Sequence, residues 1–288
     1  PKIGATFEPI KGFRFRGNWG TSFTAPTPVD QLGSLSSTLQ SFPFVPFQPT
    51  PAVTLLPGSN STIALQGSRP NLGPQEADTW SLGVDVEPTK GLRASISYYN
   101  VAFTNVLGTP TPSGAIFTDF PDNALISAAG FTATQINNFF TQNGANPLSA
   151  SLQTQLNNAI ASVGGGRVAE LVDFRVGNFG IVKVQGVDFD LSISQDIGIG
   201  SLDFNLNANV PMSRKQQVSP TSAITDVQRL DNPELFLKTG LGFGSGGFYA
   251  LATWNHTDGY NILPTPSVPV QTHVGSFNTV DLFFKYDL

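Results

Sequence analysis

The sequence has no cysteine, few charged residues and no long hydrophobic run. Without cysteine among its 288 residues, disulfides and thiolate metal sites are excluded. Charged residues are 12% of the chain, about half the share of an ordinary globular domain. The 15 Lys and Arg residues are too scattered for a nucleic-acid surface. No run of about 18 apolar residues exists, so no transmembrane helix is predicted, but a membrane barrel places apolar residues only at alternate positions.

The chain is rich in Gly, Pro and neutral polar residues. Its 29 Gly and 22 Pro, together with abundant Thr, Ser and Asn, are unfavourable in helix interiors. A hydrophobic fraction of 40%, which includes 23 Phe, is too high for a disordered chain. The composition therefore favours a large β protein with few charges.

Alternation of apolar and polar residues predicts nine strands. In the clearest of them, Phe15 and Trp19 point to one face, while Arg14 and Arg16 point to the other. Such a pattern indicates a sheet with one face in an apolar medium and one in a polar medium. The predicted strands are residues 3–8, 13–23, 79–86, 92–103, 187–193, 202–209, 234–243, 248–257 and 277–286.

One of these strands departs from the simple alternation. In residues 92–103, apolar side chains occupy even positions as far as Ile96 and odd positions from Tyr99 onwards. Because an extra residue in a strand reverses the facing of all that follow, this shift predicts a β-bulge near Tyr98.

The connections between the strands alternate strictly in length. Short turns, such as residues 9–12 and 88–91, join the two strands of a pair, and long segments join one pair to the next. In an antiparallel meander, alternate connections lie at the same end of the sheet. One end is therefore expected to carry tight turns and the other large loops, as in outer-membrane barrels. The long segments are residues 24–76, 105–180, 211–233 and 258–276.

The charges of the predicted strands gather on one face of the sheet. The opposite face is almost free of charge, as contact with hydrocarbon requires. A soluble sheet with one buried face is the alternative, but it would carry more Lys and Glu on its exposed face. We therefore predict an all-β fold, a partial antiparallel up-and-down transmembrane β-barrel of about nine strands. The predicted polar face holds Arg14, Arg16, Asn18, Asp85, Arg93, Asp188, Asp190, Asp203, Asn205 and Asn207.

The first long connection contains an apolar aromatic segment, residues 42–47, within an uncharged stretch. An exposed segment of this kind is either a contact surface or a loop that folds over its neighbours. The sequence leaves both interpretations open.

Two short helices are expected in the second long connection. Residues 132–135 form a capping box, with Phe131 and Ile136 placed for a hydrophobic staple. A second helix is indicated by apolar residues at helical spacing, with Gly164 as its C-terminal stop. We expect both helices to pack on the loop or on the barrel rim. The apolar residues are Ile136, Phe139 and Phe140 in the first helix, and Leu152, Leu156, Ile160 and Val163 in the second.

Several segments resemble the C-terminal barrel region of TonB-dependent outer-membrane receptors. Residues 70–84, PNLGPQEADTWSLGV, are similar to the family segment Asn-Pro-x-Leu-x-Pro-Glu-x-Ser-x-x-x-Glu-x-Gly, with Gln75 in the usual Glu position. Residues 1–7 and 13–26 are similar to the preceding hairpin, and residues 185–190 resemble a strand that re-enters after a long outer loop. The segments follow the order of the family and span most of the chain.

This resemblance implies a 22-stranded barrel in the cell outer membrane with an N-terminal plug. Such a receptor imports a scarce nutrient, for example a siderophore, a vitamin or an oligosaccharide, with energy passed through TonB. The implied partners are outer-membrane lipid, the receptor's own plug, the TonB complex and a small-molecule nutrient. We expect residues 1–288 to be a fragment of a single barrel domain, with the plug domain and the last strands absent.

The resemblance also gives the polar face a role, because the lumen of a receptor barrel holds the plug. We expect an inward-facing cluster of arginines and carboxylates near the tight turns, with Arg93 and either Asp85 or Glu87 as its closest pair and docking of the plug as its role. The alternative is that these residues only balance charge in a water-filled lumen. The residues expected to face the lumen and plug are Arg14, Arg16, Asp85, Arg93, Asp188 and Asp190. The candidates for nutrient binding are Asn18, Ser22, Arg69, Asn100 and Asn255.

The sequence offers little catalytic or metal-binding chemistry. Its two histidines, His256 and His273, are too few for an ordinary metal site, and no nucleophilic triad has a local context. We expect His256, close to Trp254, to lie among aromatic residues at a membrane interface. No enzyme activity, cofactor or nucleic-acid partner is expected. The alternatives are a secreted β-rich adhesin or carbohydrate-binding module, and a surface-layer or filament protein.

Overall fold

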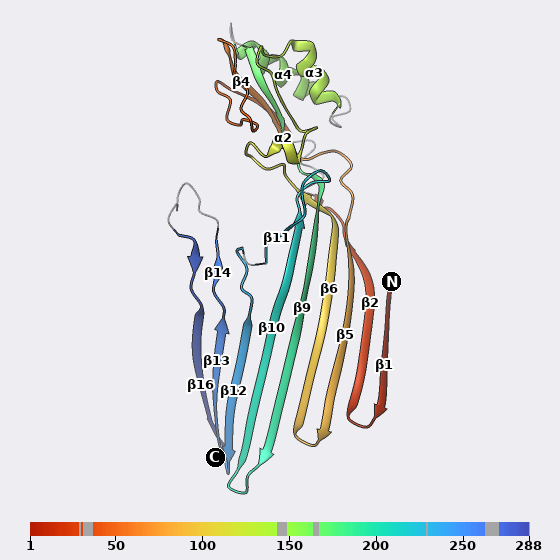
Figure 1. Cartoon of the computed structure of the whole chain (residues 1–288), viewed down its shortest axis with the longest axis vertical. Coiled ribbons are helices and arrows are strands. Elements are labelled where there is room, and N and C mark those ends of the chain that lie inside the picture. Colours follow the sequence, from red (N-terminus) through yellow and green to blue (C-terminus); the bar gives the residue numbers. More distant parts are fainter. Residues whose placement is uncertain are drawn as a thin grey trace.

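The computed structural model describes residues 1–287 apart from 29, 31–36, 143–148, 164–166, 229 and 263–270. Nine long strands form one antiparallel meander, in which each strand pairs with the long strand before it and the one after it (Figure 1). All nine predicted strands are confirmed. They are β1 (Lys2–Ile10), β2 (Phe13–Thr24), β5 (Gln75–Thr89), β6 (Leu92–Gly108), β9 (Gly177–Asp196), β10 (Ser201–Gln217), β12 (Phe236–Ser245), β13 (Phe248–Thr257) and β16 (Phe277–Tyr286).

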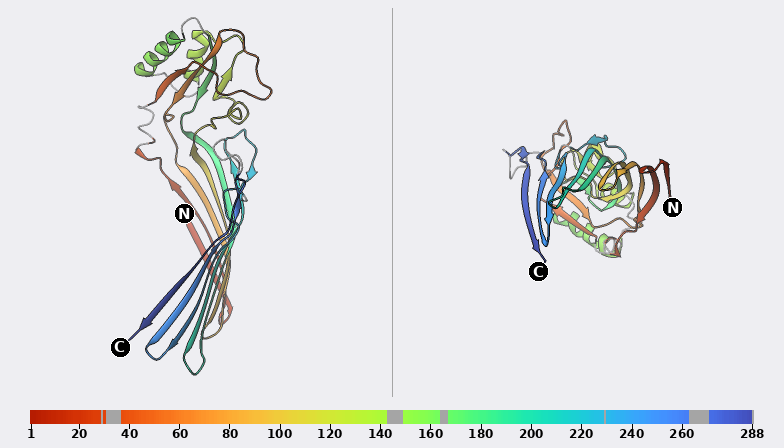
Figure 2. Two further views of the ribbon diagram at one scale, coloured as in Figure 1. Left: turned by 90° about the vertical axis from the view of Figure 1, so that its left-hand side faces the viewer. Right: turned by 90° about the horizontal axis from the view of Figure 1, so that it is seen from below.

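The sheet is a single curved layer, with β1 and β16 at its two ends (Figure 2). Among the described residues it does not close into a barrel. Tight turns lie at one end of the sheet and the long connections at the other, as Figure 1 shows, which confirms the prediction from connection length. Some connections contain very short strands: β11 (Thr225–Asp226), β14 (Tyr260–Asn261) and β15 (His273–Val274).

The pairing register keeps the two faces chemically distinct across the sheet. Because side chains alternate along a strand, residues that pair directly share a face. One such row crosses the sheet from β1 to β10 and is apolar throughout: Phe7, Phe15, Val84, Ile96, Phe189 and Ala208. A neighbouring row on the other face is polar throughout: Arg14, Asp85, Ser95, Asp190, Asn207, Lys238 and Asn255.

The apolar face is uncovered in this structure. Leu82 is 59% exposed, and Phe15, Trp19 and Trp80 are also classed as exposed, as expected for a face that meets hydrocarbon. Leu191, Phe204 and Leu206 lie on the same face and are half-buried. None of these seven belongs to either of the two core clusters found among the described residues.

The predicted bulge near Tyr98 is wrong. The register between β5 and β6 runs without a break from Asp85 opposite Ser95 to Glu76 opposite Thr104. What changes is the chemistry of the two faces: beyond Tyr98 the formerly apolar face carries Asn100 and Gln185, while Val101 and Phe103 lie on the formerly polar face. The sequence pattern shifts because the surroundings of the strand change along its length.

The two longest connections meet above the sheet and form a separate folded unit, here called the cap (residues 38–66 and 116–173; Figure 1). Its centre is a four-stranded sheet, in which two strands from different connections pair in parallel. The cap strands, in spatial order, are β3 (Thr38–Phe42), β4 (Ser59–Gln66), β8 (Arg167–Asp173) and β7 (Ala124–Ile126).

Helices lie against the cap sheet, and both predicted helices are confirmed as α3 (Ala133–Gln142) and α4 (Ala150–Ser162). They pack on one face of the sheet around a core that includes the fully buried Phe140, Leu156 and Leu171. A second core on the opposite face includes Ile116 of the short helix α2 (Ile116–Asp119). None of the helices formed by the described residues is long and apolar enough to cross a membrane.

The predicted start of α3 is present as a capping box. The side chain of Gln135 accepts a hydrogen bond from the Thr132 amide at 2.8 Å, and the Thr132 hydroxyl accepts from the Gln135 amide at 3.3 Å. Phe131 and Ile136 belong to the same core, as the staple requires. The predicted helix stop at Gly164 lies outside the described residues.

Candidate functional site

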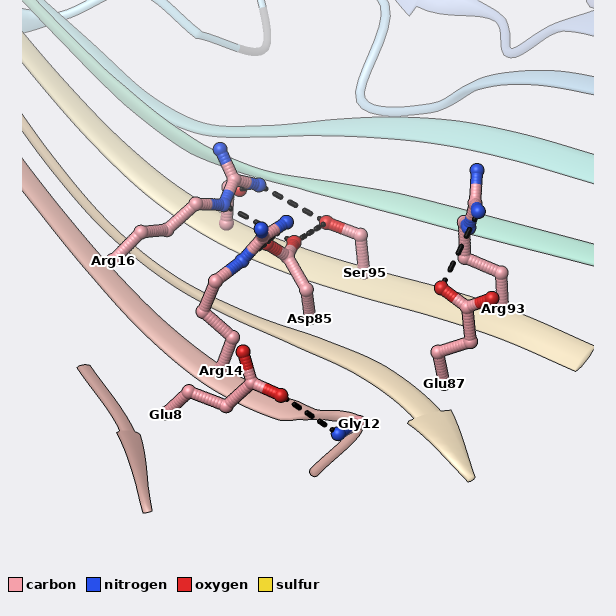
Figure 3. Close-up of polar contacts among 9 residues, drawn as sticks. Glu8, Gly12, Arg14, Arg16, Asp85, Glu87, Arg93 and Ser95 are labelled. Atoms are coloured by element: carbon pink, nitrogen blue, oxygen red, sulfur yellow. Dashed lines mark hydrogen bonds and ion pairs between the residues drawn. The ribbon is translucent and has the colours of Figure 1, made fainter. Parts of the chain in front are cut away.

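Two arginines converge on one aspartate on the polar face. Arg14 and Asp85 are direct partners in the pairing of β2 with β5, which sets their side chains side by side. Arg14 Nη2 lies 2.9 Å from Asp85 Oδ2, and Arg16 Nε lies 3.2 Å from Asp85 Oδ1 (Figure 3). The Ser95 hydroxyl donates to the same carboxylate at 2.9 Å, and Arg16 donates to Ser95 at 3.0 Å. This Arg14–Arg16–Asp85 group is here called the arginine cluster.

The prediction that Arg93 belongs to the closest ion pair of this region is wrong. Arg93 pairs with Glu87 at 3.3 Å, next to the tight turn between β5 and β6, whereas Arg14 approaches Asp85 more closely (Figure 3). Register is the reason, because Arg14 lies directly opposite Asp85. Both Arg93 and Glu87 are well exposed to solvent, so their pair contributes little to stability.

The other two predicted lumen residues are held by amides from the next strand. The Asn209 side chain donates to Asp188 at 2.7 Å and to the Tyr99 hydroxyl at 3.2 Å. Asn207 donates in the same way to Asp190. All six residues expected to face the lumen and plug therefore share one face of the sheet, and their role toward a plug stays a prediction.

The predicted nutrient-binding residues do not form one site. Asn18, Ser22 and Asn255 lie on the polar face, but at opposite sides of the sheet, on β2 and β13. Asn100 lies on the other face, where its side chain is 3.5 Å from that of Gln185. The five-residue set as a whole is therefore not one pocket, and the role of each member stays untested.

Arg69, the fifth candidate, belongs to a buried ionic group where the cap joins the sheet. Its guanidinium lies 3.6 Å from the fully buried Asp173 and 4.9 Å from the centre of the Phe179 ring. Asp173 is also paired with the buried Arg175 at 2.8 Å. Burial lowers the pKa of Arg69, and the charge of Asp173 opposes that change. These contacts favour a structural role for Arg69 at the base of the cap.

The cap and the segments that join it to the sheet form a pocket that the sequence did not predict, here called the cap pocket. It has a volume of about 550 Å³ and lies beside the aromatic segment at residues 42–47. This aromatic segment is the feature of the sequence that could have indicated the pocket. It fits both interpretations of the segment, folded loop and contact surface: Phe42 and Phe47 pack against the second core, while Phe44 is 54% exposed. The lining residues are Phe42, Phe44, Pro46, Phe47, Thr62, Ala64, Gln66, Gly67, Thr109, Pro110, Pro112 and Phe174.

A fully buried carboxyl lies beside the cap pocket. Glu170 of β8 is opposite Thr62 of β4, and their side-chain oxygens are 2.6 Å apart. Burial raises the pKa of Glu170 to about 7, although hydrogen bonds from Thr62 and from the Phe47 amide act in the opposite direction. Its second oxygen, Oε1, has no hydrogen-bond partner among the residues that the structure describes. Near neutral pH this carboxyl is therefore substantially protonated.

Each of the two histidines makes a polar contact with an asparagine: His256, at the end of β13, with Asn278, and His273 with Asn261 at 3.3 Å. The His256 ring lies 5.5 Å from the Trp254 ring, and both side chains reach the side-chain oxygen of Asn278, at 2.8 and 3.1 Å. This grouping agrees with the expected place of His256 among aromatic residues. The described part of the chain contains no group of three or more His, Cys, Asp or Glu that could hold a metal ion.

Comparison with known proteins gives one family for the whole chain. The model of the TonB dependent receptor-like β-barrel matches residues 1–288. A search of curated proteins finds no match.

Similar solved structures include a mutant ferric enterobactin receptor (PfeA) from Pseudomonas aeruginosa, with 10% identity and a TM-score of 0.58. The siderophore receptor PirA from Acinetobacter baumannii has 11% identity and a TM-score of 0.59, and the FrpB iron transporter from Neisseria meningitidis has 8% and 0.51. These matches cover 100%, 99% and 100% of this chain but 32%, 34% and 32% of the respective chains. The chain therefore spans about one third of their length, and at this identity the likeness shows the fold.

Proposed function

The chain belongs to the TonB-dependent receptor-like β-barrel family, and from this premise we propose that it forms part of an outer-membrane receptor for energy-coupled nutrient uptake. The receptor takes up a scarce small molecule and draws its energy through the TonB complex. Members of the family are transport receptors of the outer membrane rather than enzymes.

The observation that carries this proposal is the sorting of the sheet by chemistry and by connection length. One face of the meander is apolar and exposed, and the other holds the arginine cluster and the carboxylates of β9. Tight turns gather at one end of the sheet and the cap at the other. Lipid on the outside, water within, and large loops on the outer surface require this combination.

The chain supplies part of one barrel domain under this proposal. It corresponds to about one third of the similar solved structures, so the remaining strands and the plug belong to the rest of the receptor. The polar face then lines the lumen, with the arginine cluster near the periplasmic end. Arginine favours bidentate carboxylate partners, so the cluster is a candidate docking surface for the plug.

The nutrient is the finer part of the proposal. The similar structures are named as siderophore and iron receptors, so a ferric siderophore is the first substrate to test, followed by a vitamin and an oligosaccharide. Cells with and without the full-length receptor are supplied with each labelled compound, in the presence and absence of TonB. We expect accumulation of one compound that requires both proteins.

Two results would contradict the proposal. Equal accumulation in cells lacking the receptor would remove the uptake function. Loss of surface glycan binding in those cells, with uptake unchanged, would favour a β-rich adhesin or carbohydrate-binding module instead.

A further inference from the structure

The cap pocket has a floor of sheet residues and a cover of aromatic ones. Thr62, Ala64 and Gln66 occupy alternate positions of β4, so their side chains share one face of the cap sheet. The aromatic segment at residues 42–47 lies beside this floor, and the Thr62 hydroxyl bonds to the Phe44 carbonyl oxygen at 2.9 Å. The segment is thus tied to the floor by its backbone while the Phe44 side chain stays exposed.

The size and lining of the pocket suit a small aromatic molecule. Its volume of about 550 Å³ lies within the usual range for ligand sites. Phe42 lies 5.8 Å from Phe44, and Phe47 lies 5.8 Å from Phe174 in an edge-to-face arrangement. Aromatic rings prefer such offset or edge contacts, so an added ring finds favourable partners on several sides.

The pocket is uncharged as well as apolar. None of the described residues that line it is Asp, Glu, Lys or Arg. A neighbouring carboxyl, Glu170, is buried next to Thr62, and burial favours its neutral form. A charged ligand would lose its hydration on entering without gaining an opposite charge, which is unfavourable.

We propose that the cap pocket is a binding site for a neutral aromatic molecule of about two or three rings. The pocket is formed by the cap and the segments that join it to the sheet, so binding there goes beyond the proposed transport function and does not depend on TonB or on the plug. Gln66, at the exposed end of β4, provides the polar contact that orients the molecule, and the Phe side chains provide the contact area.

The test uses 6-fluoroindole, a neutral bicyclic probe with one N–H donor, and follows its fluorine NMR signal. The full-length receptor is placed in lipid nanodiscs, and empty nanodiscs supply the background for partitioning into lipid. We expect saturable binding to the receptor above this background. Phe44→Ala removes an exposed ring and should weaken binding roughly three- to tenfold, in line with the contribution of one aromatic contact. Gln66→Trp places a large side chain at the exposed edge of the floor and should abolish binding.

Two controls make the result decisive. Leu56→Ala changes a side chain that is 51% exposed in the cap but does not line the pocket, and it should leave binding unchanged. Indole-3-acetate, a charged relative of the probe, should compete at least tenfold more weakly than indole. The proposal is overturned if binding is not saturable, if Phe44→Ala and Gln66→Trp both bind like wild type, or if the charged competitor is as effective as indole. Uptake is not measured, so failure here leaves the transport proposal standing.

Discussion

Thr62 and Glu170 face each other across the parallel strands of the cap, with 2.6 Å between the hydroxyl and the carboxyl oxygen. The same hydroxyl lies 2.9 Å from the carbonyl oxygen of Phe44, which can only accept a hydrogen bond. Thr62 has one hydroxyl proton, and it can donate this proton to the carbonyl without loss of its contact to Glu170 if Glu170 is the donor in that contact. Glu170 can donate only when it is protonated. The geometry and the raised pKa of Glu170 thus agree on a neutral acid.

The first prediction follows from this neutral carboxyl. Folding raises the pKa of Glu170 from 4.5 to about 7. Below pH 4.5 the carboxyl is protonated in both the folded and the unfolded state, and as the pH rises from 4.5 to 7 the free energy of unfolding falls because the unfolded state loses its proton more readily. The difference between the two pKa values corresponds to a fall in cap stability of about 3 kcal/mol across this window. In Glu170→Gln, which resembles the protonated acid, this loss should disappear. Hydrogen exchange of β4 and β8 amides, corrected for intrinsic rates, measures it.

The matched control for this experiment is Glu76→Gln, which changes an exposed carboxyl outside the cap. It should keep the wild-type dependence of cap stability on pH. An identical pH dependence in wild type and Glu170→Gln would show that Glu170 is already charged in the folded cap.

A second prediction concerns the apolar face. Leu82 points outward from β5 and is 59% exposed, as expected for a side chain in contact with lipid. Leu82→Arg should destabilise the membrane-inserted receptor by about 2–4 kcal/mol if the residue lies near the bilayer midplane. Its neighbour Ser81 points to the polar face, so Ser81→Arg should cost clearly less. Urea-dependent folding of the full-length receptor into lipid vesicles gives both values, and equal costs would contradict the assignment of the two faces.

The long strands could be predicted from the sequence because each one separates two different media. In β2, Arg14 and Arg16 alternate with Phe15 over a sheet one layer thick, so local alternation carries the information needed to find the strand. Alternation misleads at Tyr98, where the polarity of the two faces changes. An analysis that assumes one polarity for each face along the whole strand mistakes this change for a bulge. The pairing of Arg14 with Asp85 instead depends on register, which alternation does not specify.

The cap could not be predicted, because its sheet joins distant parts of the chain. Thr62 and Glu170 are 108 positions apart, and their strands pair in parallel. In β4 five consecutive residues, Ser61 to Leu65, are buried because both faces of the cap sheet are covered, so no alternation marks the strand. The helices were found because their signals are local, as the capping box of Thr132 shows. The cap pocket depends on the distant pairing and was missed with it.

A third prediction tests that capping box. Thr132→Ala removes the hydroxyl that accepts from the Gln135 amide, and an N-cap substitution of this type costs about 0.5–2 kcal/mol. Protection of the α3 amides against hydrogen exchange should fall accordingly. Thr134→Ala is the control, because it removes the same hydroxyl from an exposed position inside the helix, where Ala is the better helix former. Equal loss of protection in both variants would contradict a capping role for Thr132.

The last prediction concerns the arginine cluster and its proposed contact with the plug. Replacing both arginines, Arg14→Glu with Arg16→Glu, places two new carboxylates beside Asp85 and reverses the charge of this part of the polar face. The pairs are partly exposed to solvent, so the loss of each should cost the barrel itself at most about 1 kcal/mol, and the receptor should still fold. Uptake should nevertheless fall, and the plug should become more accessible to protease.

Arg93→Glu is the matched control for that double variant. It reverses one charge on the same face, but next to the tight turn and in a well-exposed pair with Glu87. Uptake and protease resistance of the plug should stay close to wild type in this control. If the double variant also keeps both properties, the cluster does not dock the plug, and its three side chains balance charge in a wet lumen. If the control loses as much as the double variant, the effect comes from net charge rather than from contacts made at Arg14 and Arg16.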